Sequence, residues 1–256
     1  MLLTGFPAGM LACNCYVLAP RQGSDAIVVD PGQRAFGPLR RILDENRLTP
    51  AAVLLTHGHI DHIWSAQKVA DTFGCPVYIH PADRSMLTDP IRGFGPRIAQ
   101  VAFGAMFREP RQVVELDSDG QTLDLGGIAV TVDHTPGHTR GSVTFRVSGQ
   151  WDEGDPEEGD RDQGDRDQGD RDQGDRSAGS DAAVGRPDLV FTGDTLFNGS
   201  VGRTDLPGGS GRDLIGSIMS RLMVLDDDTR VLPGHGEAST IGVERRTNPF
   251  LQGLVL

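Results

Sequence analysis

The sequence predicts an α/β fold in which helices and β-sheets stack in layers within a single domain. In the first half, short apolar strands alternate with amphipathic helices, which is the pattern of strand–helix–strand units. In the second half, several strands follow one another across short turns, which is typical of β-hairpins. A chain of 256 residues is long enough for one such domain with a substantial core.

The first half opens on apolar residues that include Pro7 and carry no Lys or Arg before Arg21. A signal peptide needs a basic start and an unbroken apolar stretch, so we expect the first strands of the domain here instead. Apolar residues spaced three and four apart predict helices over 37–48 and 61–73, the second ended by Gly74. Apolar runs bounded by turn residues predict strands at 14–19, 26–30, 51–55 and 77–80.

The second half is dominated by strand patterns and closes on helices. Apolar residues on one face, from Leu214 to Leu222, predict a helix over 212–224, and a short helix is expected from Thr240. The predicted strands of this half are 112–116, 122–125, 127–133, 142–148, 188–191 and 229–232.

Residues 152–186 differ from the rest of the chain in composition. They contain 13 acidic side chains and 5 arginines, and the unit Asp-Arg-Asp-Gln-Gly occurs three times in tandem from Asp160 to Gly174. Such a segment has too little apolar surface to offset the entropy of ordering it. We therefore expect a disordered acidic insert within a domain that spans 1–256. The alternative is a calcium-binding segment, although the spacing lacks the Asp-x-Asp-x-Asp-Gly pattern of a calcium loop.

Charge and cysteine content exclude several classes of protein. The net charge is −12, of which the insert carries −8, and nucleic-acid binding requires a concentrated basic face instead. No apolar run approaches the roughly 18 residues of a membrane-spanning helix. Three cysteines form no disulfide framework, so we expect a cytoplasmic protein with neither a nucleic-acid nor a membrane partner. The oligomeric state stays open.

Three of the seven histidines lie in one short segment, Thr56-His57-Gly58-His59-Ile60-Asp61-His62. It follows a predicted buried strand and precedes a predicted helix. His57 and His59 are two apart and can face one point in an extended loop, whereas Asp61 and His62 lie on a helical turn and face another. Imidazole and carboxylate are ligands for zinc, iron and manganese. The segment is therefore able to supply ligands to two adjacent metal ions.

Three more candidate ligands stand where predicted strands end. His138 lies in TPGHT, Asp194 in FTGDT and His235 in LPGHG, and glycine beside each lets the backbone approach a site closely. Each is a weak signal alone, but together with the first cluster they match the number of ligands that two metal ions need. For His80 and His134 we expect structural roles.

These motifs resemble a known family. THGHIDH, TPGHT, FTGDTLF and LPGHG, with Val29-Asp30-Pro31-Gly32, resemble the ordered motifs of the metallo-beta-lactamase superfamily over nearly the whole chain outside 152–186. The segments NCYV, GRTD and ERRTNPF resemble its small bacterial glyoxalase II-like (hydroxyacylglutathione hydrolase-like) proteins. The resemblance implies an α/β fold, a four-layer αββα metallo-beta-lactamase sandwich with the site at one edge.

The resemblance also implies two divalent metal ions, with zinc as the first choice and iron or manganese as alternatives. Asp194 would bridge them, and Asp30 would hold the His57–His62 loop by hydrogen bonds without binding metal. The remaining ligands would be His57, His59 and His138 for the first ion, and Asp61, His62 and His235 for the second.

Two divalent ions lower the pKa of bound water to about 7, so hydroxide forms near neutral pH. We expect it to attack the carbonyl carbon of a small-molecule thioester such as S-lactoylglutathione, oriented by Asp61. The leaving thiolate needs little protonation, so no separate general acid is required. Arg203 is a candidate contact for an anionic substrate, although an ion pair with Asp205 is an equal expectation.

Other functions remain open from the sequence. Glyoxalase II enzymes carry an additional C-terminal helical region that helps to bind glutathione, and this sequence ends at Leu256, which puts acyl-glutathione itself in question. A persulfide dioxygenase with one iron shares the fold and the GRTD segment. A non-catalytic metal-binding interaction protein is a further alternative. A secreted β-lactamase and an RNA-processing nuclease are disfavoured, the first by the N-terminus and the second by the acidic charge.

Overall fold

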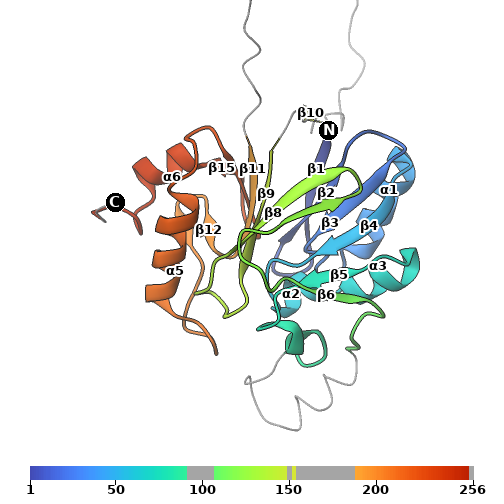
Figure 1. Cartoon of the computed structure of the whole chain (residues 1–256), viewed down its shortest axis with the longest axis horizontal. Helices are drawn as coiled ribbons and strands as arrows, with labels where there is room; N and C mark the ends of the chain where they lie inside the picture. Colours follow the sequence, from blue (N-terminus) through green and yellow to red (C-terminus); the bar gives the residue numbers. More distant parts are fainter. Residues whose placement is uncertain (91–106, 149–151, 154–187, 254–256) are drawn as a thin grey trace, which may run out of the picture.

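The computed structural model describes residues 1–90, 107–148, 152–153 and 188–253, and two β-sheets form its centre (Figure 1). β2 runs antiparallel to both of its neighbours, and the strands from β3 to β6 run parallel. The first sheet contains, in spatial order, β10 (Asp152–Glu153), β1 (Leu2–Ala8), β2 (Cys13–Ala19), β3 (Asp25–Val29), β4 (Thr49–Leu54), β5 (Val77–Ile79) and β6 (Val113–Glu115).

The second sheet is built mainly from hairpins, with one parallel pair between β11 and β14. A small separate hairpin pairs β12 (Leu196–Phe197) with β13 (Ser200–Val201). The second sheet contains, in spatial order, β15 (Ser239–Thr240), β14 (Arg230–Pro233), β11 (Leu189–Gly193), β9 (Val143–Val147), β8 (Ile128–His134) and β7 (Thr122–Leu125).

Helices cover the outer faces of both sheets (Figure 1). On the first sheet these are α1 (Phe36–Asn46) and α3 (Ala66–Phe73). On the second they are α5 (Gly211–Ser217), its π-helical continuation η2 (Ile218–Leu222) and α6 (Ile241–Thr247). Two short helices, α2 (Ile60–Ile63) and η1 (Arg84–Leu87), lie in the loops that follow β4 and β5.

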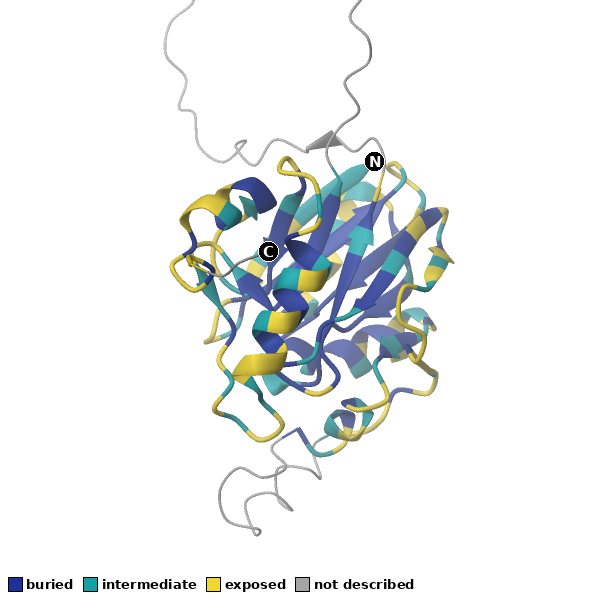
Figure 2. Cartoon of the chain, turned by 60° about the vertical axis from the view of Figure 1, so that its left-hand side comes forward, coloured by how far each residue is buried: buried dark blue, intermediate teal, exposed yellow. Residues whose placement is uncertain are grey.

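The burial of β2 explains why the structure has four layers. Successive side chains of a strand point to opposite faces, and all seven residues of β2 are buried. Val17 packs with the helix residues Leu39 and Val69, whereas Leu18 packs with Phe145 of the second sheet. A third apolar cluster joins the far face of the second sheet to its helices. Figure 2 shows dark blue strands between helices whose outer faces are yellow. The predicted αββα sandwich is confirmed.

The predicted continuous helix 61–73 is wrong, because the chain is interrupted between α2 and α3. The Ser65 amide donates to the Pro31 carbonyl at 2.8 Å instead of to Asp61, and its hydroxyl donates to the Gly32 carbonyl at 2.7 Å. The Asp61 carbonyl accepts from the Gln33 amide instead. The loop after β3 therefore takes over the hydrogen bonds that would continue the helix.

Several element bounds also differ from prediction. β4 starts at Thr49 and includes Pro50, at a register shift where the missing N–H of proline is tolerated. The predicted helix 212–224 becomes α5 followed by η2. The first two residues of the acidic insert form β10, which pairs with Leu2 and Leu3 at the sheet edge. The rest of the insert, 154–186, lies outside the described residues, and its disorder stays a prediction.

Candidate metal centre

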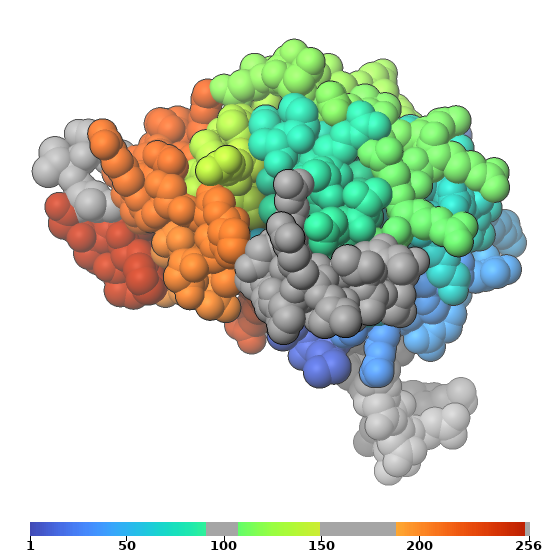
Figure 3. Space-filling model, turned by 90° about the horizontal axis from the view of Figure 1, so that it is seen from below, coloured from blue at the N-terminus to red at the C-terminus, as the bar shows by residue number. Residues whose placement is uncertain are grey.

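The predicted ligands lie in loops that leave the carboxyl ends of strands. The His57–His62 segment follows β4, His138 lies in the turn after β8, and Asp194 and His235 directly follow β11 and β14. Because β11 and β14 are parallel neighbours, their ends meet at one edge of the second sheet. Figure 3 shows this end of the molecule, where teal segments of the first half lie beside yellow-green and orange segments of the second.

Three imidazoles converge in a first group. The Nε2 atom of His57 lies 3.1 Å from Nδ1 of His59, and Nε2 of His138 lies 2.8 Å from the same Nδ1 atom. His57 and His138 are buried, and His59 is partly exposed. The three nitrogen atoms therefore face one point, as the spacing of His57 and His59 predicts.

A second group lies beside the first. The Nε2 atoms of His62 and His235 are 3.3 Å apart, and a carboxylate oxygen of Asp61 lies 3.2 Å from Nε2 of His235. Asp194 stands between the groups, because its Oδ2 is 3.5 Å from Nε2 of His138 and its Oδ1 is 3.3 Å from Nε2 of His62. All seven predicted ligands are therefore close together.

In three of the rings, a hydrogen bond made by Nδ1 outside the cluster determines that Nε2 faces the cluster. Nδ1 of His138 donates to the Arg203 carbonyl at 2.8 Å, and Nδ1 of His235 donates to the Leu11 carbonyl at 2.9 Å. A carbonyl only accepts, so these Nδ1 atoms carry protons. Nδ1 of His62 bonds a carboxylate oxygen of Asp30 at 2.9 Å in the same way. In each ring, Nε2 is left for the cluster.

A relay through Thr56 orients His57. The Thr56 hydroxyl donates to Asp30 at 2.6 Å, so it accepts from Nδ1 of His57 at 3.1 Å. Asp30 also accepts from the Thr56 amide at 2.8 Å, and its backbone adopts the left-handed region at φ +46°. Asp30 thus holds the His57–His62 loop through hydrogen bonds, the geometry expected from the sequence.

The electrostatics of the two groups differ. Burial lowers the pKa of His57, of His138 and of His59, the last to about 4, so the first group consists of neutral imidazoles. In the second group, burial acts to lower the pKa of His62 and of His235, but nearby acidic groups outweigh it and raise both. These groups are Cys13, Asp194 and Asp30 for His62, and Asp61 and Asp194 for His235. The second group therefore favours positive charge between its members.

One oxygen in the cluster has no hydrogen-bond partner. Oδ1 of Asp194 is among four buried side-chain atoms without a partner in the described part of the chain. It faces the Nε2 atoms of the second group, while Oδ2 faces the first. Lone pairs of nitrogen and oxygen thus converge on two points, and a buried group of acceptors needs a cation to satisfy it. The donor set fits divalent metal ions.

A pocket of about 500 Å³ opens onto the cluster. Leu11, Ile60, Pro90 and Leu206 supply apolar surface, and Arg203 is also part of the wall. The guanidinium of Arg203 forms two 2.8 Å contacts with the Asp205 carboxylate, as one of the two expectations from the sequence had it. A small organic molecule is therefore able to reach the converging side chains.

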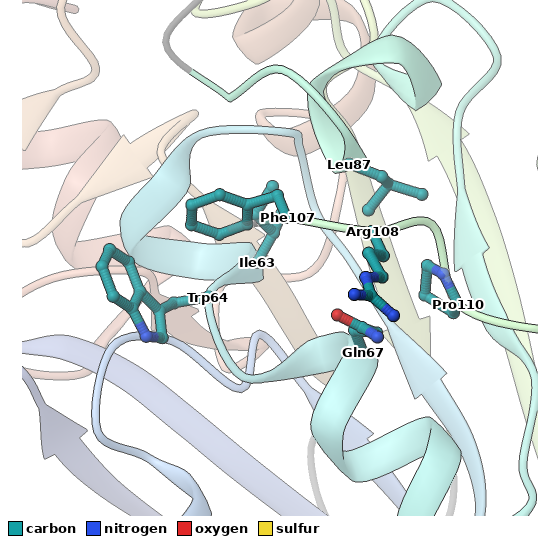
Figure 4. A pocket seen from close by; sticks show the side chains of 7 residues that line it. All are labelled: Ile63, Trp64, Gln67, Leu87, Phe107, Arg108 and Pro110. Carbon is teal, nitrogen blue, oxygen red and sulfur yellow. The ribbon is translucent and has the colours of Figure 1, made fainter. Parts of the chain in front are cut away.

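A second, smaller pocket of about 100 Å³ lies beside α2 and α3 (Figure 4). Trp64 and Phe107 meet edge to face with ring centres 5.3 Å apart, and the Arg108 guanidinium lies over the Gln67 amide. The other lining residues are Ile63, Leu87 and Pro110. Its lining contains no carboxylate, imidazole or thiol, so it is not a candidate metal site.

Two residues of β2 hold the loop of His235, a role that no motif spacing reveals. The Asn14 side-chain amide donates to the carbonyls of Pro233 and Gly236 at 3.0 and 2.9 Å, and the Tyr16 hydroxyl donates to the Pro233 carbonyl at 2.7 Å. The only sequence signal was the resemblance carried by Asn-Cys-Tyr-Val. It did not indicate what these side chains contact.

The two remaining histidines lie outside both groups. The rings of His80 and His134 stack 4.2 Å apart and nearly parallel. Nε2 of His134 bonds the Arg140 carbonyl at 3.0 Å, and Nδ1 of His80 accepts from the Ala82 amide at 3.2 Å. Their contacts are those of residues that support loops.

Among the described residues, none of the helices has the length and apolar character needed to cross a bilayer.

Comparison with known proteins gives consistent matches. A sequence model of the metallo-beta-lactamase superfamily matches residues 8–149 and 183–235. An uncharacterized protein of Mycobacterium tuberculosis is 65% identical over 254 residues, 99% of each chain. The hydroxyacylglutathione hydrolase GloC of Haemophilus influenzae is 30% identical over 93% of this chain and 92% of its own.

Solved structures are similar over the same length. The B3 metallo-beta-lactamase BLEG-1 superposes with a TM-score of 0.73 at 32% identity, covering 98% of this chain and all of that chain. TTHA1623, solved in a di-iron-bound form, has a TM-score of 0.67 at 32% identity over 97% of this chain and all of its own.

Proposed function

This chain belongs to the metallo-beta-lactamase superfamily, and on that premise we propose that it is a metal-dependent hydrolase of thioesters, acting on S-lactoylglutathione or a related acyl-thiol. Membership of a superfamily of metallo-hydrolases supports an enzyme. The observation that carries the proposal is the convergence of acceptor atoms from four loops on two neighbouring points, with one Asp194 oxygen left without a partner.

In this proposal, the two groups hold one divalent ion each. His57, His59 and His138 would bind the first, Asp61, His62 and His235 would bind the second, and Asp194 would serve both. Two complete groups favour two ions over the single iron of a dioxygenase. Zinc is our first choice, and the di-iron form of TTHA1623 makes iron an alternative beside manganese.

The ions, when bound, supply a nucleophile from water near neutral pH and polarise the substrate carbonyl. The chain's own residues position the reactants. Asp61 presents a carboxylate oxygen beside His235, where we assign it to orienting the attacking water. The hydrogen bonds from His62, His138 and His235 to Asp30, Arg203 and Leu11 keep the rings from turning.

The pocket and the relatives support a thioester as the substrate class. The name of the Haemophilus relative states hydroxyacylglutathione hydrolysis for that protein. Apolar Leu11, Ile60 and Leu206 suit the acyl or thiol part of a small thioester, and we assign Arg203, at the pocket wall, to an anionic group of the substrate. The low pKa of thiols makes the leaving thiolate stable without a protein acid.

We place this activity in the cytoplasm, without a nucleic-acid or membrane partner. Cys13, Cys15 and Cys75 are all free and buried, which suits a reducing compartment. The net charge of −12 opposes binding to phosphate backbones.

The test combines elemental analysis with a substrate panel. The purified protein should contain close to two divalent ions per chain and hydrolyse at least one thioester faster than the His59→Ala variant. His80→Ala, a histidine outside the cluster, is the matched control and should retain activity. No turnover above the His59→Ala background on any thioester would contradict the hydrolase. One iron per chain with oxygen uptake on a persulfide would support the dioxygenase instead.

A further inference from the structure

Asp83 is a buried carboxylate at a helix N-terminus that its side chain does not cap. It immediately precedes η1, where an aspartate side chain ordinarily accepts from the first amides of the helix. Here the side chain caps none of them. It is nevertheless fully buried. A buried carboxylate is costly unless hydrogen bonds satisfy it, so its partners lie elsewhere.

The partners of Asp83 come from the two loops that carry the first group. Its Oδ2 accepts from the Gly58 amide at 3.0 Å and from the Thr139 hydroxyl at 2.6 Å, and its Oδ1 accepts from the Gly141 amide at 2.9 Å. Gly58 stands between His57 and His59, and Thr139 follows His138. One carboxylate therefore joins the two segments that supply the three imidazoles.

The packing around Asp83 is as tight as its hydrogen bonding. A Cβ atom on Gly141 would lie 2.6 Å from Cγ of Asp83, and one on Gly58 would lie 2.6 Å from the sulfur of Met86 in η1. Leu87 of η1 and Ile63 of α2 line the same small pocket (Figure 4). At Gly58 and Gly141, Met86 and Asp83 are thus packed directly against the ligand loops.

We propose that Asp83 is a positioning residue that sets the distance between the His57–His59 segment and His138, and so determines the affinity of the first metal group. This inference rests on the proposed assignment of those three histidines to one ion. The segments that carry these histidines follow β4 of the first sheet and β8 of the second, and Asp83 bonds to both segments. A carboxylate suits the role because all three groups that face it are donors.

Asp83→Asn is the direct test. An asparagine has one oxygen and one NH₂ group, so in either orientation an N–H faces a backbone N–H of Gly58 or Gly141. Asp133→Asn is the matched control, because Asp133 is also buried and bonded, to Arg146 in the second sheet. The two variants are compared with the wild type by metal content after dialysis and by chelator competition.

The expected result is selective. Asp83→Asn should lose one ion per chain and bind it about 10–100-fold more weakly, the usual effect of removing a partner that orients ligands. When both variants are loaded with Co²⁺, the absorption spectrum of Asp83→Asn should match that of His59→Ala, because each should retain only the ion of the second group. Asp133→Asn should keep both ions even if its melting temperature falls as far as that of Asp83→Asn. This pattern is not expected from general destabilisation.

Thr139 provides a second test that does not depend on Asp83→Asn folding. Thr139→Val removes the hydroxyl with little change of shape, and Thr139→Ser keeps the hydroxyl. The valine variant should bind the ion of the first group several-fold more weakly, and the serine variant should bind it as tightly as the wild type. In an Asp83→Asn background, Thr139→Val should have no further effect.

The outcomes separate the two proposals. A wild type that binds two ions while Asp83→Asn binds both with unchanged affinity overturns the role of Asp83 and leaves the metal centre intact. Equal losses in Thr139→Val and Thr139→Ser also count against it. A wild type that binds no divalent ion overturns the proposed function, and with it this inference.

Discussion

The two groups of the candidate metal centre differ in charge and in the hydrogen bonds that hold them. The first contains three imidazoles whose pKa values are lowered, and it has no carboxylate of its own. The second combines Asp61 with two imidazoles whose pKa values are raised. Hydrogen bonds between rings join the first group, whereas the second also contains a contact between a carboxylate and an imidazole, Asp61 with His235. We infer that the neutral group depends more on outside hydrogen bonds for its geometry.

The supports differ accordingly. Within the described residues, the side-chain hydrogen bonds of Asp83 go to the segments of the first group. Asp30 bonds His62 directly and His57 through Thr56, so it serves both groups. Asn14 and Tyr16 support the loop of His235 alone. The comparison therefore predicts different losses of metal for different variants.

Asp194→Asn should have the largest effect, because one oxygen of Asp194 faces each group. Removal of its charge should weaken the binding of both ions and lower turnover by at least about 10³-fold. Steady-state kinetics and metal content measure it, with Asp133→Asn as the control for loss of a buried carboxylate. Retention of two ions and of a tenth or more of the turnover would show that Asp194 does not join the groups.

Asp30→Asn should come next, with losses in both groups. It removes an acceptor used by Thr56 or His62, so each ion should bind about 10–100-fold more weakly. Metal content then distinguishes it from Asp83→Asn, which should keep the second ion. If Asp30→Asn releases only the ion of the second group, the Thr56 relay to His57 is unimportant.

Arg203→Ala should have a smaller effect, of less than about tenfold in KM, with metal content unchanged. The Arg203 carbonyl, and not its side chain, holds His138, and the exposed guanidinium is paired with Asp205. Kinetics on one anionic and one neutral thioester measure it, beside Asp205→Ala, which frees the guanidinium. Loss of metal in Arg203→Ala would mean that the side chain is needed to keep the carbonyl in place.

The smallest expected effect is on the pH dependence of stability. Burial, and then His134, lowers the pKa of His80 below its ordinary 6.5, so the folded protein favours the neutral ring. Asp83, Asp117 and Glu115 act in the opposite direction without reversing it. The neutral His80 ring therefore contributes to the free energy of unfolding above pH 6.5, and this contribution is lost as the pH falls through the lowered pKa. Between pH 7.5 and 5.5, His80→Gln should lose about 1–2 °C less in melting temperature than the wild type.

The convergence of the candidate ligands was predictable because metal binding requires particular residue types at close spacing. His57, His59, Asp61 and His62 lie in six residues, and the other ligands follow strands with glycine beside them. The four-layer fold was predictable from strand and helix periodicity together with the resemblance. These signals are local, so the chain reveals them before it folds.

The supports were not predictable in the same way. Asp83 and Asn14 are single polar residues whose partners lie on distant segments. The break between α2 and α3 depends on Pro31 and Gly32, which approach only in the folded protein. Asp205 was a clear candidate for Arg203 because the two are only two residues apart. Tertiary hydrogen bonds leave no periodic trace in the sequence.

The bond from Asn14 to Pro233 joins residues 219 positions apart, so the loop of His235 gains this support only when nearly the whole chain has been synthesised. The loops of His57 and His138 leave the ribosome long before the segment of His235. A nascent chain thus contains the neutral trio while the charged group is still incomplete. In the proposed two-ion centre, the ligands of the first ion are therefore complete in the growing polypeptide before those of the second.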